Sequence, residues 1–84
     1  MKFYRIKEIG ENQFIPQQCD TIADSLFNFW YGIQVDNKRI TTWYNKEYQD
    51  MYCIVKSLEE AKEVIGKYQA MYNIQKQYPK YHKL

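Results

Sequence analysis

The clearest pattern along this chain is a three- and four-residue repeat of apolar positions between Ser57 and Gln75. Spacing of this kind gathers side chains onto one face of a helix. Ser57 and Glu60 form a capping-box signature. In this motif the Ser hydroxyl accepts a hydrogen bond from a backbone amide of the first turn, and the Glu carboxylate reaches back to the backbone amide of the capping residue. Glu59 and Glu60 also lie where the helix dipole favours negative charge. The pattern predicts a C-terminal helix whose apolar face comprises Leu58, Ala61, Val64, Ile65, Tyr68, Met71 and Tyr72.

Gly66 interrupts this helical pattern. Glycine inside a helix costs about 1 kcal/mol relative to alanine. Either another part of the molecule approaches the helix closely there, or Gly66 is a tolerated surface residue. The second interpretation is slightly favoured.

The N-terminal segment has a two-residue period instead. Apolar and charged residues alternate across residues 2–9, which is typical of a half-buried strand. Residues 10–12 have the composition of a turn, and residues 13–16 are expected to return as a second strand. Because Pro16 has no N–H to donate, we expect that strand to lie at a sheet edge or to end there.

Residues 20–31 allow two interpretations. Asp20 or Thr21 would cap a helix with a 3.6-residue apolar period, and Gly32 would end that helix. The rival interpretation is a strand in which the aromatic residues of 27–31 alternate and which continues into the next segment. The polar residues at the start of the segment, Asp20, Asp24 and Ser25, and the 3.6-residue period of its apolar positions favour the helix.

The following segments predict more sheet. Residues 32–35 and 38–44 are expected to be strands joined by a tight turn at 36–37, because Asp and Asn accept the positive φ of a two-residue hairpin. The polar stretch 45–50 is expected to be a connection. The apolar run 51–55 predicts a more central strand that leads directly into the C-terminal helix.

Together these segments predict one small α+β domain over residues 1–84. We expect a small antiparallel sheet of four or five strands packed against the C-terminal α-helix, with a second short helix in the middle. Residues 76–84 would form a basic and aromatic tail, since Pro79 prevents the helix from continuing.

Tyrosine is the compositional outlier. The aromatic share is 18%, with nine tyrosines, and a domain this small cannot bury all of these rings. Exposed Tyr and Trp are common at binding surfaces. We therefore expect a protein-docking surface that includes Trp30, Tyr31, Trp43, Tyr44 and Tyr48.

The formal net charge of +2 is mild for a nucleic-acid-binding domain. Cations beside aromatic rings would nevertheless suit a nucleotide or a single-stranded nucleic acid. The residues for this alternative lie in the first strand, the middle hairpin and the tail: Arg5, Lys7, Lys38, Arg39, Lys80, Tyr81 and Lys83.

The sequence shows no catalytic motif. His82 is the only histidine and lies near the C-terminus, where a general base would be poorly held. The glycines are isolated, so no phosphate-binding loop is indicated. Cys19 and Cys53 lack the spacing of a metal site or disulfide framework and are expected to be buried thiols. We therefore predict a non-enzymatic protein with no catalytic residues, no metal and no cofactor.

These observations predict a small binding or accessory protein, an inhibitor or modulator that docks on a larger protein or protein complex. A homodimer is a further option, and nucleic-acid or nucleotide binding is the alternative function. With no apolar span or leader in the sequence, we expect a cytoplasmic protein that does not associate with membranes. The abundance of Lys, Ile, Tyr, Phe and Asn suits an AT-rich genome. This suggests a phage or mobile-element origin and a role in countering host defence.

Overall fold

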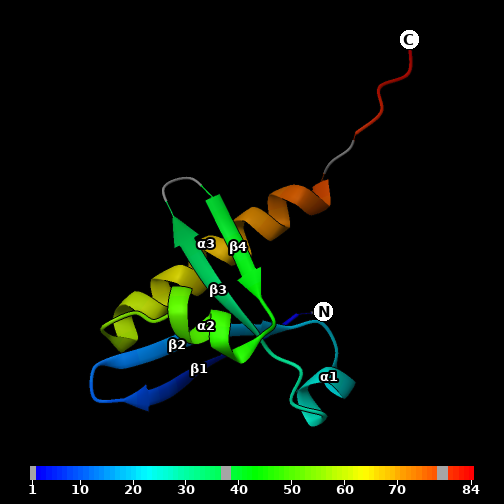
Figure 1. Cartoon of the computed structure of the whole chain (residues 1–84). Helices are drawn as coiled ribbons and strands as arrows, with labels where there is room; N and C mark the ends of the chain where they lie inside the picture. The colour runs from blue at the N-terminus through cyan, green and yellow to red at the C-terminus, as the bar shows by residue number, and fades with distance from the viewer. Residues whose placement is uncertain (1, 37–38, 78–79) are drawn as a thin grey trace.

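The computed structural model describes residues 2–36, 39–77 and 80–84, without the side chains of 75–77. These residues form an antiparallel sheet of order β1-β2-β3-β4 and three helices (Figure 1). The elements are β1 Phe3–Gly10, β2 Gln13–Cys19, α1 Ile22–Leu26, β3 Tyr31–Asp36, β4 Arg39–Trp43, α2 Lys46–Tyr52 and α3 Leu58–Gln77. The predicted α+β fold is confirmed: a four-stranded sheet, a long C-terminal helix and a short helix in the middle. The turn predicted at 36–37 lies partly outside the described residues.

The N-terminal hairpin is confirmed, but its second strand is more central than predicted. β2 continues past Pro16 and lies between β1 and β3, so the prediction of an edge or an end at Pro16 is wrong. The N–H of Phe14 points away from β1, to the carbonyl of Val55, and Pro16, two residues further on, faces the same way. β3 pairs with β2 only at Gln17 and Gln18, so no neighbouring strand needs a donor from Pro16.

The middle helix, α1, is shorter than predicted. Thr21 caps it, and its hydroxyl accepts a hydrogen bond from the amide of Asp24 at 3.0 Å. The chain then turns at Asn28, which has a φ of 62°. Gly32 lies inside β3 and has no positive φ, so the predicted helix end at Gly32 is wrong.

α2 is the largest departure from the sequence prediction. The segment expected to connect, 45–50, and the first residues of the strand expected at 51–55 form this helix instead. Val55 makes only an isolated bridge with Phe14. The predicted central strand at 51–55 is therefore wrong.

The sequence pattern missed α2 because its inward positions are not apolar throughout. Asn45 caps the helix by accepting from the amide of Glu47 at 2.9 Å. The helix buries Gln49, and the buried Cys53 follows at its C-terminus, four residues later. Since one of these two positions is polar, the helical period of hydrophobic residues is absent on the side that faces the sheet.

α3 forms as predicted and packs against β1, β2 and β3. The amide of Glu60 donates to the Ser57 hydroxyl at 3.1 Å. The Glu60 carboxylate accepts from the amide of Lys56, one residue before the N–H that a capping box uses. A Cβ added at Gly66 would meet no atom within 4 Å, so Gly66 is a tolerated surface glycine.

α2 covers the opposite face of the sheet from α3. A Cβ at Gly32 would point at Gln49 and Cys53, whereas the next residue, Ile33, is buried on the other face because side chains alternate along a strand. Both cysteines are free and buried, as predicted. Burial raises the pKa of the Cys53 thiol to about 12 and also raises the pKa of Cys19.

Candidate binding surfaces

α2 presents its aromatic side chains outward. Tyr48, Met51 and Tyr52 are 47%, 59% and 44% exposed, while Gln49 and Cys53 are buried. A surface helix of a globular protein ordinarily turns its apolar side to the core and its polar side to water. α2 departs from this pattern at Gln49, which is buried, and at Tyr48, Met51 and Tyr52, which are exposed.

Trp43 on β4 extends this outward-facing group. Its indole stacks on Tyr52 with ring centroids 4.9 Å apart and an interplanar angle of 24°, and its centroid lies 5.5 Å from that of Tyr48. The indole Nε1 donates to Oε1 of Gln34 at 2.9 Å, which fixes the orientation of the ring. We call Trp43, Tyr48, Met51 and Tyr52 the α2 aromatic surface.

A second aromatic group lies beside α1, where β4 ends. The ring of Tyr44 lies 5.3 Å from that of Tyr31 and 6.0 Å from that of Phe29, and the rings of Phe29 and Phe27 are 6.3 Å apart. Phe27, Phe29 and Tyr44 are exposed and Tyr31 is half-buried. We call these four residues the α1 aromatic group.

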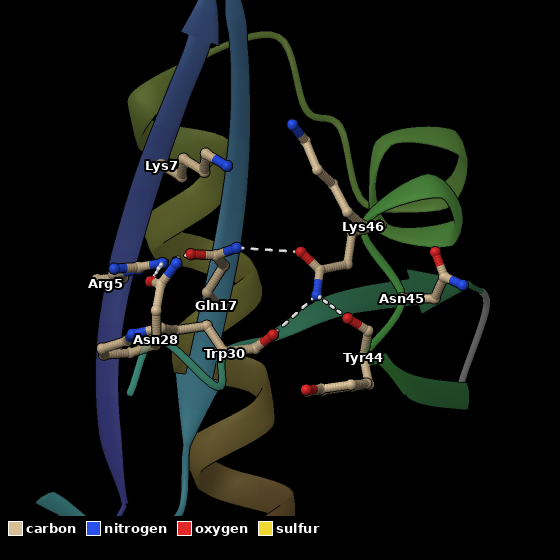
Figure 2. A pocket seen from close by; sticks show the side chains of 9 residues that line it. Arg5, Lys7, Gln17, Asn28, Trp30, Tyr44, Asn45 and Lys46 are labelled. Carbon is tan, nitrogen blue, oxygen red and sulfur yellow. Dashed lines mark hydrogen bonds between the residues drawn. The ribbon is translucent and has the colours of Figure 1, made fainter. Parts of the chain in front are cut away.

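A pocket of about 360 Å³ opens beside Tyr44 (Figure 2). Its lining includes three cations and no carboxylate. We call it the basic pocket, and it is lined by Arg5, Lys7, Gln17, Asn28, Trp30, Tyr44, Asn45, Lys46 and Gln49. Strands β1 and β2 form one wall, and the start of α2 forms the other (Figure 2).

Gln49 holds the floor of the basic pocket together. Its amide nitrogen donates to the carbonyl oxygens of Trp30, Trp43 and Tyr44, each at 2.8 Å. Its amide oxygen accepts from Nε2 of Gln17 at 3.1 Å. One buried side chain therefore links α2 to β2, to the end of β4 and to the residue before β3.

Arg5 is held in place by neutral groups. Its Nε donates to Oε1 of Gln17 at 2.6 Å and its Nη2 to Oδ1 of Asn28 at 3.1 Å, and the guanidinium lies 4.2 Å from the ring centroid of Trp30. Burial lowers the pKa of Arg5, yet a guanidinium stays cationic in proteins. Among the described residues no carboxylate forms an ion pair with Arg5, Lys7 or Lys46.

The predicted docking residues fall into two groups. Trp43 and Tyr48 belong to the α2 aromatic surface, and Tyr31 and Tyr44 belong to the α1 aromatic group. Trp30 is only 8% exposed, because the guanidinium of Arg5 covers its ring, so it does not fit the role of an exposed anchor.

The residues predicted for nucleic-acid binding are not brought together. Arg5 and Lys7 line the basic pocket. Arg39 begins β4 and lies at the opposite end of that strand from the pocket. The tail residues Lys80, Tyr81 and Lys83 lie beyond α3, where the chain leads away from the sheet (Figure 1). Lys38 lies outside the described residues.

Several residues of these sites were not predicted: Gln17, Lys46, Gln49, Met51 and Tyr52. The sequence did contain one signal for α2. Tyr48, Met51 and Tyr52 have the three- and four-residue spacing of a helix face, and Asn45 is a favoured capping residue. No local pattern marks Gln17 or Gln49, whose roles depend on contacts between distant parts of the chain.

No protein-family model, curated protein or solved structure matches this chain. Within the described residues, no three His, Cys, Asp or Glu side chains gather in a way that would hold a metal ion. None of the helices described is both long and apolar enough to cross a membrane.

Proposed function

We propose that this protein is a non-enzymatic binding protein that docks on a larger protein through the α2 aromatic surface and inhibits or modulates that partner. The observation that carries the proposal is the group of large side chains, two of them aromatic, that α2 leaves exposed on its outer side. The helix buries Gln49 and exposes Tyr48, Met51 and Tyr52.

The aromatic residues of α2 contact the sheet through Trp43 of β4, yet Tyr48 and Tyr52 each leave close to half of their surface exposed. Gln49 and Cys53 make the fully buried contacts with the sheet, and the exposed parts of the rings have no such burial. Exposed aromatic groups of this kind mark interaction sites, and Trp and Tyr are enriched among the residues that dominate binding energy. The stack of Trp43 on Tyr52 and its bond to Gln34 also order the rings in advance, which lowers the entropic cost of binding.

The proposal is tested by capture from a bacterial lysate followed by mass spectrometry. The lysate should come from a bacterium with an AT-rich genome, because the composition suggests such a host. Tyr48→Ser with Tyr52→Ser should abolish enrichment of the partner. Tyr81→Ser is the matched control, because Tyr81 is 90% exposed in the tail and its loss should leave capture unchanged.

Circular dichroism and thermal unfolding establish that the double variant is folded. If a folded double variant captures the same protein as the wild type, the α2 aromatic surface is not the docking site and the proposal fails. A second copy of the chain is the other occupant to consider. Light scattering would then show a dimer that the double variant loses, and this result would replace the larger partner with a homodimer.

A further inference from the structure

We propose that the basic pocket binds the phosphate group of a small phosphate-bearing ligand, of the size and class of a mononucleotide. The pocket uses residues outside the α2 aromatic surface, so this proposal does not rest on docking to a protein.

Charge is the first reason. Arg5, Lys7 and Lys46 line one pocket with no carboxylate among the lining residues. Arg5 and Lys7 are both half-buried on β1, and they lie on the same face of the strand because they are two residues apart. Partly buried like charges repel one another more strongly than charges in bulk water. A phosphate monoester carries about −1.5 to −2 charges at pH 7, which balances such a site better than a single carboxylate.

The supply of hydrogen-bond donors is the second reason. Arg5 uses Nε and Nη2 in the bonds to Gln17 and Asn28, and a guanidinium has further N–H groups to offer. The ammonium groups of Lys7 and Lys46 also line the pocket, and each ammonium carries three donors. A phosphate has three acceptor oxygens, which matches a wall rich in donors.

Preorganisation is the third reason. Gln17 accepts from Arg5 and donates to Gln49, whose amide is itself fixed by backbone carbonyls. The guanidinium therefore keeps its position without a ligand, and binding needs little reordering.

The dimensions of the pocket favour a small ligand over a nucleic-acid strand. About 360 Å³ is within the range of roughly 300–1,000 Å³ typical of small-molecule sites. The exposed ring of Tyr44 lies at its rim and can stack against a base. A nucleic-acid strand would need a basic groove that follows its backbone, whereas Arg39 and the tail cations lie elsewhere.

The test is isothermal titration of the full chain with inorganic phosphate, ribose 5-phosphate, AMP, adenosine and a short oligonucleotide. We expect the three phosphate-bearing small molecules to bind and adenosine not to bind. Lys46→Gln should weaken AMP binding about tenfold, the effect of losing one charged hydrogen bond. Tyr44→Ser should weaken AMP binding but leave inorganic phosphate unaffected, which separates nucleotides from other phosphates.

Lys62→Gln is the matched control, because Lys62 is exposed on α3 and its loss changes the net charge by the same amount. The proposal is overturned if adenosine binds as well as AMP, if no phosphate-bearing small molecule binds, or if only the oligonucleotide binds. Equal weakening by Lys46→Gln and Lys62→Gln would also overturn it, since only overall charge would then matter. Protein capture is a separate readout that Lys46→Gln should leave unchanged, so failure of one proposal is distinguishable from failure of the other.

Discussion

The two helices that cover the sheet are attached to it in different ways. α3 contributes a regular apolar stripe, in which Ala61 is fully buried, and it covers the face where Ile33 is 1% exposed. α2 instead inserts Gln49, which is 5% exposed and bonds to three backbone carbonyls and one side chain. Apolar burial dominates the attachment of α3, whereas the attachment of α2 adds a buried hydrogen-bond network to the contacts of Cys53 and Tyr52.

This difference decides what each helix leaves at the surface. On the α3 side, tyrosines serve packing: Tyr4 and Tyr68 meet edge to face with centroids 6.1 Å apart, and Lys2 lies 4.8 Å from the ring centroid of Tyr72. On the α2 side, Gln49 does the attaching, and Tyr48 and Tyr52 remain exposed. Tyrosine therefore packs against its neighbours on the α3 side and is left about half exposed on the α2 side.

The largest effect is expected at the apolar face. Ile33→Ala removes a side chain that is 1% exposed and should lower the free energy of unfolding by about 2–5 kcal/mol, through lost burial and the cavity left behind. Urea unfolding measures this change.

Ile22→Ala is the control for Ile33→Ala, because Ile22 is 64% exposed on α1 and the same change there should fall within about 0.5 kcal/mol of wild type. Similar losses for the two variants would mean that the α3 face is not the apolar core, and the contrast between the faces would disappear.

A somewhat smaller effect is expected at the polar face. Gln49→Leu preserves most of the side-chain volume but removes the buried hydrogen bonds to the amide of Gln17 and to three backbone carbonyls. Unfolding free energy should fall by about 1–3 kcal/mol, the cost of unsatisfied buried groups. Gln69→Leu makes the same change on the exposed side of α3 and should have little effect. If Gln49→Leu were neutral in urea unfolding, hydrogen bonding would not be what attaches α2.

The sequence predicts elements well where each depends on its own local pattern. The alternation in residues 2–9 and the cap at Ser57 each specify an element from residues close together, and both elements form. The predicted apolar face of α3 is not buried at its first residue, since Leu58 is 44% exposed. α2 was missed because a buried glutamine breaks the period on its inward side.

Local sequence patterns of this kind could not predict the basic pocket. Its residues come from β1, β2, the loop before β3, the loop after β4 and α2. Arg5 and Lys7 were recognised as cations beside rings, but nothing local connects them to Lys46, about forty residues away in a stretch predicted to be a connection. Only the antiparallel order of the strands and the fold of α2 against them bring these side chains to one cavity.

A glycine on each face gives the last contrast, and the change at Gly66 is the smallest effect expected. Gly66→Ala on α3 should stabilise the protein by about 1 kcal/mol, because alanine is the better helix former and an added Cβ meets no atom within 4 Å. The melting temperature should rise by about 4–8 °C. Gly32→Ala should do the opposite, since its Cβ would lie 2.8 Å from Cγ of Gln49 and 2.9 Å from Sγ of Cys53. That substitution forces α2 away from the sheet, and destabilisation of about 1–3 kcal/mol is expected from overpacking. A rise in melting temperature for both variants would mean that α2 can shift without cost, so the bonds of Gln49 would not fix its position on the sheet.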